Sequence, residues 1–159
     1  MRYDQFREVA KDGDILFLHV NRKDFLSTLT SWFTKSEYTH AAFVFWYKDR
    51  LMVVESTTHG GLRIVTASQY QDRELDIVAA PKDWNTISAR ALEKSGTAEY
   101  GWFSAAYIGL REFMFTHFDI KLPEDKTNRN QACSEFVAEM LGLPDNDISP
   151  GMLMKYLRG

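Results

Sequence analysis

Hydrophobic and polar residues follow one another along the chain in a way that separates a strand-rich part from a helical part. Short apolar or alternating runs bounded by turn residues predict β-strands at 15–18, 39–47, 51–56, 62–66 and 74–80. The run 39–47 is apolar on both faces, which favours a central position in a sheet. A hairpin turn at 48–50 makes 39–47 and 51–56 antiparallel neighbours. We expect the strands from residue 39 onward to form an antiparallel meander.

Apolar residues at helical spacing predict helices before, between and after these strands. The expected helices lie at 3–11, 22–34, 83–95, 101–116 and 132–141, with a last short one opened by Ser149 and Pro150. Asp83 is placed to cap one helix, and Gly142 with Pro144 ends another. A polar loop is expected at 119–130. This layout predicts a single α+β domain over 1–159, an antiparallel β-sheet packed against helices on one side.

Composition excludes several classes of protein. The 159 residues are 45% hydrophobic and 26% charged, with a formal net charge of −3, which fits one globular core and no nucleic-acid partner. No apolar run is long enough for a membrane span, and the first residues lack the apolar core of a signal peptide. We therefore expect a cytoplasmic protein, unless a phage or another export route delivers it. The oligomeric state stays open.

The single cysteine, Cys133, makes an intramolecular disulfide impossible and disfavours a cysteine-based zinc site, so no metal or cofactor is expected. Cys133 lies in the first turn of the helix predicted at 132–141, where unpaired backbone N–H groups and the helix dipole favour a thiolate. The same N–H groups can stabilise an oxyanion. The alternative is a small apolar residue in a buried stripe, because Cys133 shares a helical face with Phe136, Val137, Met140 and Leu141.

A thiol nucleophile needs a base, and four histidines are available. His40 opens the apolar strand 39–47, so it projects from the edge of a rigid core element. His19, His59 and His117 lie at a strand end, in a glycine-rich turn and at the start of a polar loop, where surface positions are expected. His40 is therefore the candidate base.

The candidate orienting group is Glu55, which follows two valines in the strand 51–56. Burying a carboxylate without a partner is costly, so its position in an apolar strand points to a partner. Pairing about the turn at 48–50 places Glu55 close to residues 43–45, a few residues from His40. The alternative is a solvated carboxylate at a strand end.

Several short motifs resemble those of one family. This chain contains GDILF at 13–17 and SEYTHAA at 36–42, which resemble the opening motifs of the permuted NlpC/P60 proteins of the YiiX-like group. Glu55 in VVES resembles the acidic position of that group, and CSEFV at 133–137 resembles its nucleophile helix. Tyr100 lies in YGW, which resembles the Y-x-W that precedes the cysteine in the superfamily. The resemblance covers roughly residues 12–142, in the order histidine, acid, cysteine.

This resemblance implies a papain-like, circularly permuted NlpC/P60 fold and a cysteine hydrolase, an amidase or peptidase that works through a thioester. Cys133 would attack a carbonyl, His40 would accept the thiol proton, and Glu55 would fix the imidazole tautomer. The backbone N–H of Ser134 and the side chain of Tyr100 would stabilise the oxyanion. The implied partner is a peptide or acyl-amide substrate, with murein (peptidoglycan) fragments as the usual one.

Three alternatives remain open at this point. Lecithin:retinol-acyltransferase-like proteins share the order of histidine first and cysteine last, so a thiol acyltransferase or a lipid-amide hydrolase fits the same motifs. A non-catalytic module that binds a peptide or acyl chain fits them too. For Tyr100, a core aromatic residue beside Trp102 is the competing interpretation.

Overall fold

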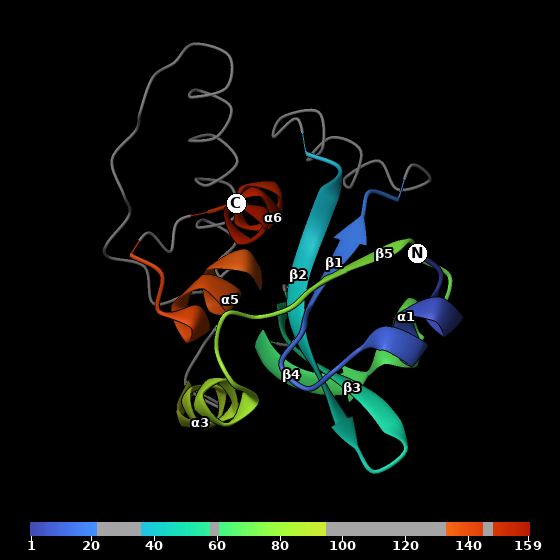
Figure 1. The fold of residues 1–159 in the computed structure, drawn as a ribbon, viewed down its shortest axis with the longest axis horizontal. Helices are drawn as coiled ribbons and strands as arrows, with labels where there is room; N and C mark the ends of the chain where they lie inside the picture. Colours follow the sequence, from blue (N-terminus) through green and yellow to red (C-terminus); the bar gives the residue numbers. More distant parts are fainter. Residues whose placement is uncertain (22–35, 58–60, 95–132, 145–147) are drawn as a thin grey trace.

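The computed structural model, drawn in Figure 1, describes residues 1–21, 36–57, 61–94, 133–144 and 148–159. Its helices are α1 (Tyr3–Val9), α3 (Trp84–Lys94), α5 (Cys133–Leu141) and α6 (Pro150–Arg158), with a 3-10 turn η1 (Ala67–Tyr70). Its strands are β1 (Ile15–His19), β2 (Tyr38–Tyr47), β3 (Arg50–Thr57), β4 (Gly61–Thr66) and β5 (Leu75–Val78). The five predicted strands are confirmed. The helices expected at 22–34 and 101–116 and the loop expected at 119–130 lie outside the described residues.

The strands form one antiparallel sheet in the order β4-β3-β2-β1-β5. β2 lies in the middle, as its doubly apolar sequence predicts. The meander prediction is correct for β2, β3 and β4 but wrong for the last strand, because β5 pairs with β1 at the opposite edge, with Ile77 across from Leu16. The chain crosses one face of the sheet through η1, where Ala67 is buried, before Leu75 enters the core. Burial of these apolar side chains therefore decides the position of β5.

The hairpin between β2 and β3 is tighter than the sequence predicts. Arg50 pairs with Tyr47, so the turn has two residues, and Lys48 takes the left-handed backbone conformation with φ 56°. This register places Val54 opposite Phe43. Continued by one step, the same register would set the next residue of β3 opposite Ala42, nearer to the start of β2 than the predicted 43–45.

β2 and β3 pair from the hairpin turn as far as Phe43 and Val54, and further from the turn the two strands separate. β2 continues in register with β1 alone, with Ala42 opposite Leu16, while β3 continues with β4. The parted ends carry His40 on one strand and Glu55 on the other. The sheet therefore opens at the place where the sequence predicts a site.

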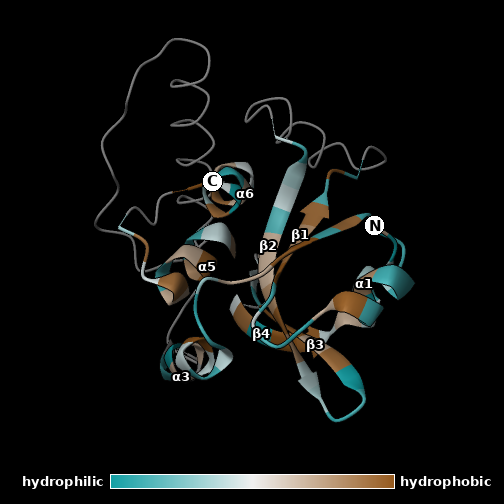
Figure 2. Cartoon of the chain, in the orientation of Figure 1, coloured by the Kyte–Doolittle hydropathy of each residue, from teal (hydrophilic) through white to brown (hydrophobic). Residues whose placement is uncertain are grey.

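Helices cover both faces of the sheet, which corrects the expectation of helices on one side. Residues of α3, α5 and α6 pack against one face, and Phe6 of α1 packs against the other with Ala67 of η1 (Figure 1). Figure 2 shows brown, hydrophobic residues on β1 and on part of β3, and teal, hydrophilic residues at the beginning of β2 and in the turn of the β2–β3 hairpin. The predicted α+β class is confirmed, with a core on each side of the sheet.

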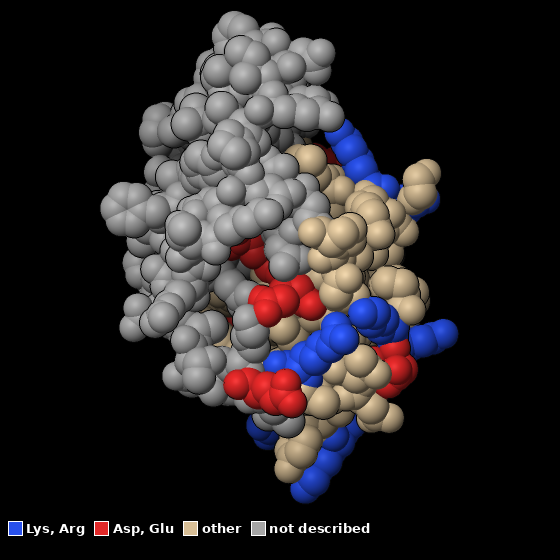
Figure 3. Space-filling view, turned by 90° about the vertical axis from the view of Figure 1, so that its left-hand side faces the viewer, with Lys and Arg blue, Asp and Glu red and all other residues tan. Residues whose placement is uncertain are grey.

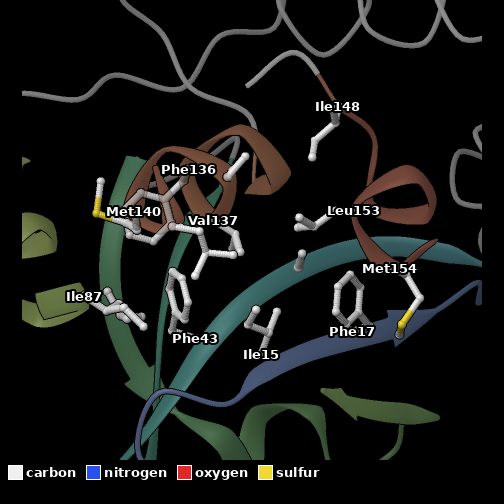
Figure 4. Packing of buried hydrophobic residues seen from close by; sticks show 14 of the residues in the cluster. Ile15, Phe17, Phe43, Ile87, Phe136, Val137, Met140, Ile148, Leu153 and Met154 are labelled. Carbon is white, nitrogen blue, oxygen red and sulfur yellow. The ribbon is translucent and has the colours of Figure 1, made fainter. Parts of the chain in front are cut away.

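The larger core fixes α5 against β2. Phe43 of β2 and Phe136 of α5 meet edge to face, with ring centroids 6.1 Å apart and planes at 78° (Figure 4). Both side chains are fully buried, and burial of a side chain of this size contributes about 1.5–3 kcal/mol. The hydroxyl of Ser134 donates to the backbone oxygen of Ile148 at 2.6 Å. The first turn of α5 is thus anchored on both sides.

The ends of two helices follow the sequence-based prediction. Asp83 accepts hydrogen bonds from the backbone N–H of Thr86 at 3.0 Å and from its hydroxyl at 2.8 Å, and so caps α3. Ser149 caps α6, with Pro150 at its first position. Gly151 lets α6 approach the start of β2 closely, because a Cβ added there would lie 2.2 Å from the Ser36 hydroxyl oxygen.

Candidate active site

Three elements bring His40, Glu55 and Cys133 together. The Nε2 atom of His40 lies 2.6 Å from Oε2 of Glu55. On its other side, the imidazole hydrogen-bonds the sulfur of Cys133, the first residue of α5 as described. The His40 side chain is 15% exposed, Glu55 is 0% exposed, and Cys133 is buried. The structure therefore places the imidazole between a thiol and a carboxylate, in a site largely closed to solvent.

Two backbone N–H groups, one from β2 and one from α5, interact with the Cys133 sulfur. The N–H of Ala41, which follows His40 in β2, hydrogen-bonds the Cys133 sulfur, and so does the N–H of Ser134 in α5. Donors of this kind favour the negatively charged form of sulfur over the neutral thiol. The side chain of Ser134 is used elsewhere, since it bonds Ile148.

The Glu55 carboxylate has two further partners that the sequence analysis missed. Arg63 of β4 donates to Oε1 from Nε at 3.0 Å, and its Nη2 forms an ion pair with Oε1 at 2.9 Å. The hydroxyl of Tyr70 in η1 donates to Oε2 at 2.5 Å. Arg63 sits directly opposite Glu55 in the β3–β4 register, so pairing of the two predicted strands could have found it. Tyr70 follows β4 in an irregular segment, and no sequence pattern points to it.

Neighbouring charges shift the ionisation of all three groups. Burial alone would lower the pKa of His40, but the Cys133 sulfur and the Glu55 carboxylate raise the pKa to about 10. Burial alone would raise the pKa of Cys133, yet the charge and hydrogen bond of His40 and the two backbone N–H groups bring this pKa below its ordinary value. Both shifts favour a thiolate–imidazolium pair over a neutral thiol beside a neutral imidazole.

The ionisation of Glu55 has the same origin. Burial pushes its pKa up, and the hydrogen bonds from His40, Tyr70 and Arg63 more than offset this, so that the pKa lies below its ordinary value. Burial and the neighbouring carboxylate raise the pKa of Tyr70, which keeps its hydroxyl a neutral donor. Glu55 is therefore an anion at neutral pH although no part of it is exposed.

Tyr100 and the three other histidines divide into two groups. Tyr100, His59 and His117 lie outside the described residues. His19 is half-buried rather than on the surface, with Nε2 3.4 Å from Asp76 and Nδ1 3.6 Å from Glu37, so the surface prediction for it is wrong. The ring of Tyr38 lies beside the His19 ring, with centroids 4.8 Å apart.

An apolar cavity of about 490 Å³ lies between α3 and the strands β2, β3 and β4. Its lining includes Phe45, Val54, Leu62, Arg63, Ile64, Trp84, Ser88 and Ala91. The rings of Phe45 and Trp84 stack with centroids 4.9 Å apart. Arg63 belongs both to the cavity lining and to the candidate site, because it also bonds Glu55. The cavity suits an apolar group.

The surface charges and the lengths of the described helices do not point to a particular partner. Acidic and basic side chains lie next to one another on the face drawn in Figure 3. In the parts of the chain that the structure describes, no helix is long and apolar enough to cross a membrane. Within the same residues, no three or more His, Cys, Asp and Glu side chains gather in a way that would hold a metal ion.

Comparison with known proteins identifies the family. The profile of the family described as "Permuted papain-like amidase enzyme, YaeF/YiiX, C92 family" matches residues 9–148. A comparison with curated proteins found no match. The matched range covers most of the chain and contains His40, Glu55 and Cys133. The chain therefore belongs to the permuted papain-like amidases of the YaeF/YiiX, C92 family.

Proposed function

We propose that this protein is a cysteine amidase or peptidase in which Cys133, His40 and Glu55 form the catalytic set. The observation that carries the proposal is the position of the His40 imidazole, which bonds the Cys133 sulfur on one side and Glu55 at 2.6 Å on the other. A nucleophile, a base within hydrogen-bond reach and a third group that orients the base make up the arrangement that covalent catalysis requires. Membership in an amidase family supports the same reaction class.

The first half of the reaction forms a thioester. The Cys133 thiolate attacks the amide carbonyl carbon, and the carbonyl oxygen takes up the electron pair as an oxyanion. We assign the backbone N–H of Ser134 and the side chain of Tyr100 as the donors to this oxyanion. The His40 imidazolium gives its proton to the amide nitrogen, the C–N bond breaks and the amine leaves.

The second half releases the acid and restores the resting state. Neutral His40 takes a proton from a water molecule, whose oxygen attacks the thioester carbonyl. The C–S bond breaks, the carboxylic acid leaves, and Cys133 is again a thiolate beside an imidazolium. Glu55 holds the same ring tautomer throughout and offsets the positive charge each time the ring carries it.

Peptides are the substrates we assign first, with murein peptides as the leading class. The experiment incubates the protein with murein peptides and an amide library, and follows released amines together with the intact mass of the protein. Wild type should show an acyl adduct on Cys133 that hydroxylamine removes, and Cys133→Ala should show neither adduct nor product. Cys133→Ala should still bind substrate, because the binding surface is unchanged.

The same measurement separates the competing functions. An acyltransferase would place the acyl group on an added amine or alcohol instead of water. A binding module would hold the ligand equally well in wild type and in Cys133→Ala and release nothing. Absence of both adduct and product across peptide, amide and lipid substrates would overturn the hydrolase proposal.

An amide of a long acyl chain is a second candidate substrate, favoured by the apolar cavity beside Val54 and Arg63. An N-acyl amide series of increasing chain length tests it. If the cavity holds the chain, kcat/KM should rise with length and Trp84→Ala should flatten the rise, because Trp84 forms one stacked wall. A flat series in wild type would exclude this substrate class.

A further inference from the structure

Three hydrogen bonds and an ion-pair contact hold the Glu55 carboxylate, which is more than orientation of a single imidazole requires. Oε1 accepts a hydrogen bond from Nε of Arg63 at 3.0 Å, and Nη2 of Arg63 forms an ion pair with it at 2.9 Å. Oε2 accepts the Tyr70 hydroxyl at 2.5 Å and lies 2.6 Å from Nε2 of His40. Each oxygen therefore has its own donors, and the plane of the carboxylate is fixed from both ends.

The charges around this carboxylate alternate in sign. The charged groups form a row across four elements. In order they are the thiolate of Cys133 on α5, the imidazolium of His40 on β2, the carboxylate of Glu55 on β3 and the guanidinium of Arg63 on β4. Tyr70 on η1 adds a neutral donor. A carboxylate that is 0% exposed cannot remain ionised by hydration, so it depends on these partners.

The partners differ in what they do for Glu55. Arg63 is the permanent cation of the group, because a guanidinium keeps its proton at every pH at which the protein is folded. His40 supplies a positive charge only while it is protonated. Tyr70 shares Oε2 with His40 and so determines where that oxygen lies.

We propose that Arg63 and Tyr70 are positioning residues of the active site: Arg63 keeps Glu55 ionised, and Tyr70 holds Oε2 against the His40 ring, so that the thiolate–imidazolium pair persists into acidic pH. The consequence for catalysis rests on the proposed function. The consequence for Cys133 itself needs no substrate, because it concerns the reactivity of the thiol.

The competing account is structural. Arg63 and Glu55 are direct neighbours across β3 and β4, and a cross-strand ion pair stabilises a sheet whatever its chemistry. Under that account, loss of Arg63 lowers the melting temperature and leaves the ionisation of Cys133 unchanged. The pH dependence of thiol reactivity therefore separates the two accounts.

The experiment measures the rate of iodoacetamide alkylation of the full chain as a function of pH. Cys133 is the only cysteine, so the rate reports one site. The variants are Arg63→Gln, Arg63→Lys and Tyr70→Phe. The matched control is Arg73→Gln, because Arg73 donates to the backbone oxygen of His19 at 2.8 Å and so serves a different part of the fold.

In wild type, the rate should fall on acidification only well below pH 8.5, the ordinary thiol pKa. Without Arg63, the pKa of Glu55 rises and its protonated form no longer supports the imidazolium. The acid limb of the Arg63→Gln profile should therefore move up by about one pH unit or more. Arg63→Lys should move it less, since the charge stays, and Tyr70→Phe should also give a smaller upward shift. Arg73→Gln should leave the limb in place.

An acid limb of Arg63→Gln that coincides with wild type, or that moves to lower pH, would overturn the proposal. If Arg63→Gln does not fold, Arg63→Lys and Tyr70→Phe decide, and unshifted limbs in both overturn it too. The proposal is also overturned if the alkylation rate of wild type falls on acidification already near pH 8.5, the ordinary thiol pKa. Failure of the proposed function looks different: the limbs shift as expected, and yet wild type releases no amine from any amide.

Discussion

In the described part of the molecule, His40 and His19 each lie beside a buried or partly buried carboxylate, and the difference between the two sites shows what makes one of them a candidate active site. His40 lies 2.6 Å from Glu55 at the centre of the sheet. His19 lies 3.4 Å from Asp76 at the β1–β5 edge. The two rings are almost equally covered, with 15% and 16% of the side chain exposed. Coverage of the histidine therefore does not distinguish the pairs.

Each carboxylate also has a tyrosine and an arginine. Tyr70 donates to Glu55 at 2.5 Å, and Tyr38 donates to Asp76 at 2.6 Å. Arg63 gives Glu55 a hydrogen bond at 3.0 Å and an ion-pair contact at 2.9 Å from a second nitrogen, whereas Arg158 reaches Asp76 through one nitrogen at 3.3 Å. The same four kinds of side chain thus occur twice in one small domain.

The two clusters differ in the burial of the carboxylate and in the presence of sulfur. Glu55 is 0% exposed, while the Asp76 side chain is 24% exposed. Water can replace a lost partner of Asp76 but not of Glu55. Only His40 has a thiol on its free side. A list of residue types is therefore not sufficient to define an active site, and the predictions below test both differences.

The largest expected effect comes from removing each histidine in turn. His40→Ala should reduce turnover by about 10²–10⁴-fold, because the thiol loses its base and the leaving amine its acid. It should also slow alkylation of Cys133 at neutral pH, because the imidazolium no longer stabilises the thiolate. His19→Ala should change neither rate. Equal losses in both variants would mean that the two clusters do not differ in function.

The next effect comes from neutralising each carboxylate. Glu55→Gln should fold and lose about 10²-fold or more in turnover, since an amide orients the ring but does not offset its charge. Glu55→Ala should lose more. Asp76→Asn should keep its turnover and show only a lower melting temperature. Wild-type turnover in Glu55→Gln and Glu55→Ala would remove Glu55 from the mechanism.

The contributions of His40 and Asp76 to stability should depend on pH with opposite signs. The folded-state pKa of His40 is raised to about 10, so its contribution to stability is full below its ordinary value and disappears as pH rises through about 10. Turnover should disappear over the same range, as the ring loses the proton it gives to the leaving group. Urea unfolding and activity, measured at a series of pH values, test both statements.

For Asp76, burial is outweighed by the Tyr38 hydroxyl and His19, so its folded-state pKa is depressed. Its contribution to stability is therefore present above its ordinary value and is lost as pH falls. Asp76→Asn should flatten the acid side of the stability profile and leave the alkaline side unchanged. A change on the alkaline side would mean that the two clusters are coupled.

The smallest effect is expected from Tyr38→Phe. Loss of this hydroxyl should lower the free energy of unfolding by about 1 kcal/mol, because Asp76 keeps other partners and some water. Cys133 alkylation should keep its wild-type pH profile, in contrast to Tyr70→Phe. Thermal melts and alkylation rates of the two tyrosine variants, measured side by side, check this.

Local parts of the fold could be predicted from the sequence, and distant contacts could not. The β2–β3 hairpin, the capping Asp83 and the candidate set His40, Glu55 and Cys133 follow from short patterns and motifs. The position of β5 beside β1 does not, because η1 redirects the chain and no local pattern specifies the partner strand. The prediction of all helices on one face failed because α1 is too short for its pattern to show which face it covers.

The same limit applies inside the candidate site. Glu55 was recognised by its place in an apolar strand, but the exact hairpin register depended on whether Arg50 belonged to the turn or to the strand. Arg63 was within reach of a pairing argument across β3 and β4. Tyr70 was not, because a hydroxyl that arrives from a 3-10 turn leaves no periodic trace in the sequence.

The order of the site residues along the chain has a consequence for synthesis. His40 and Glu55 are separated by 15 residues and belong to one hairpin, whereas Cys133 belongs to a helix that follows all five described strands. A ribosome therefore synthesises the proposed base and its carboxylate before it adds Cys133, the proposed nucleophile. The described strands can pair before the helix that carries the sulfur leaves the ribosome, so the three side chains meet only when that helix packs against the sheet.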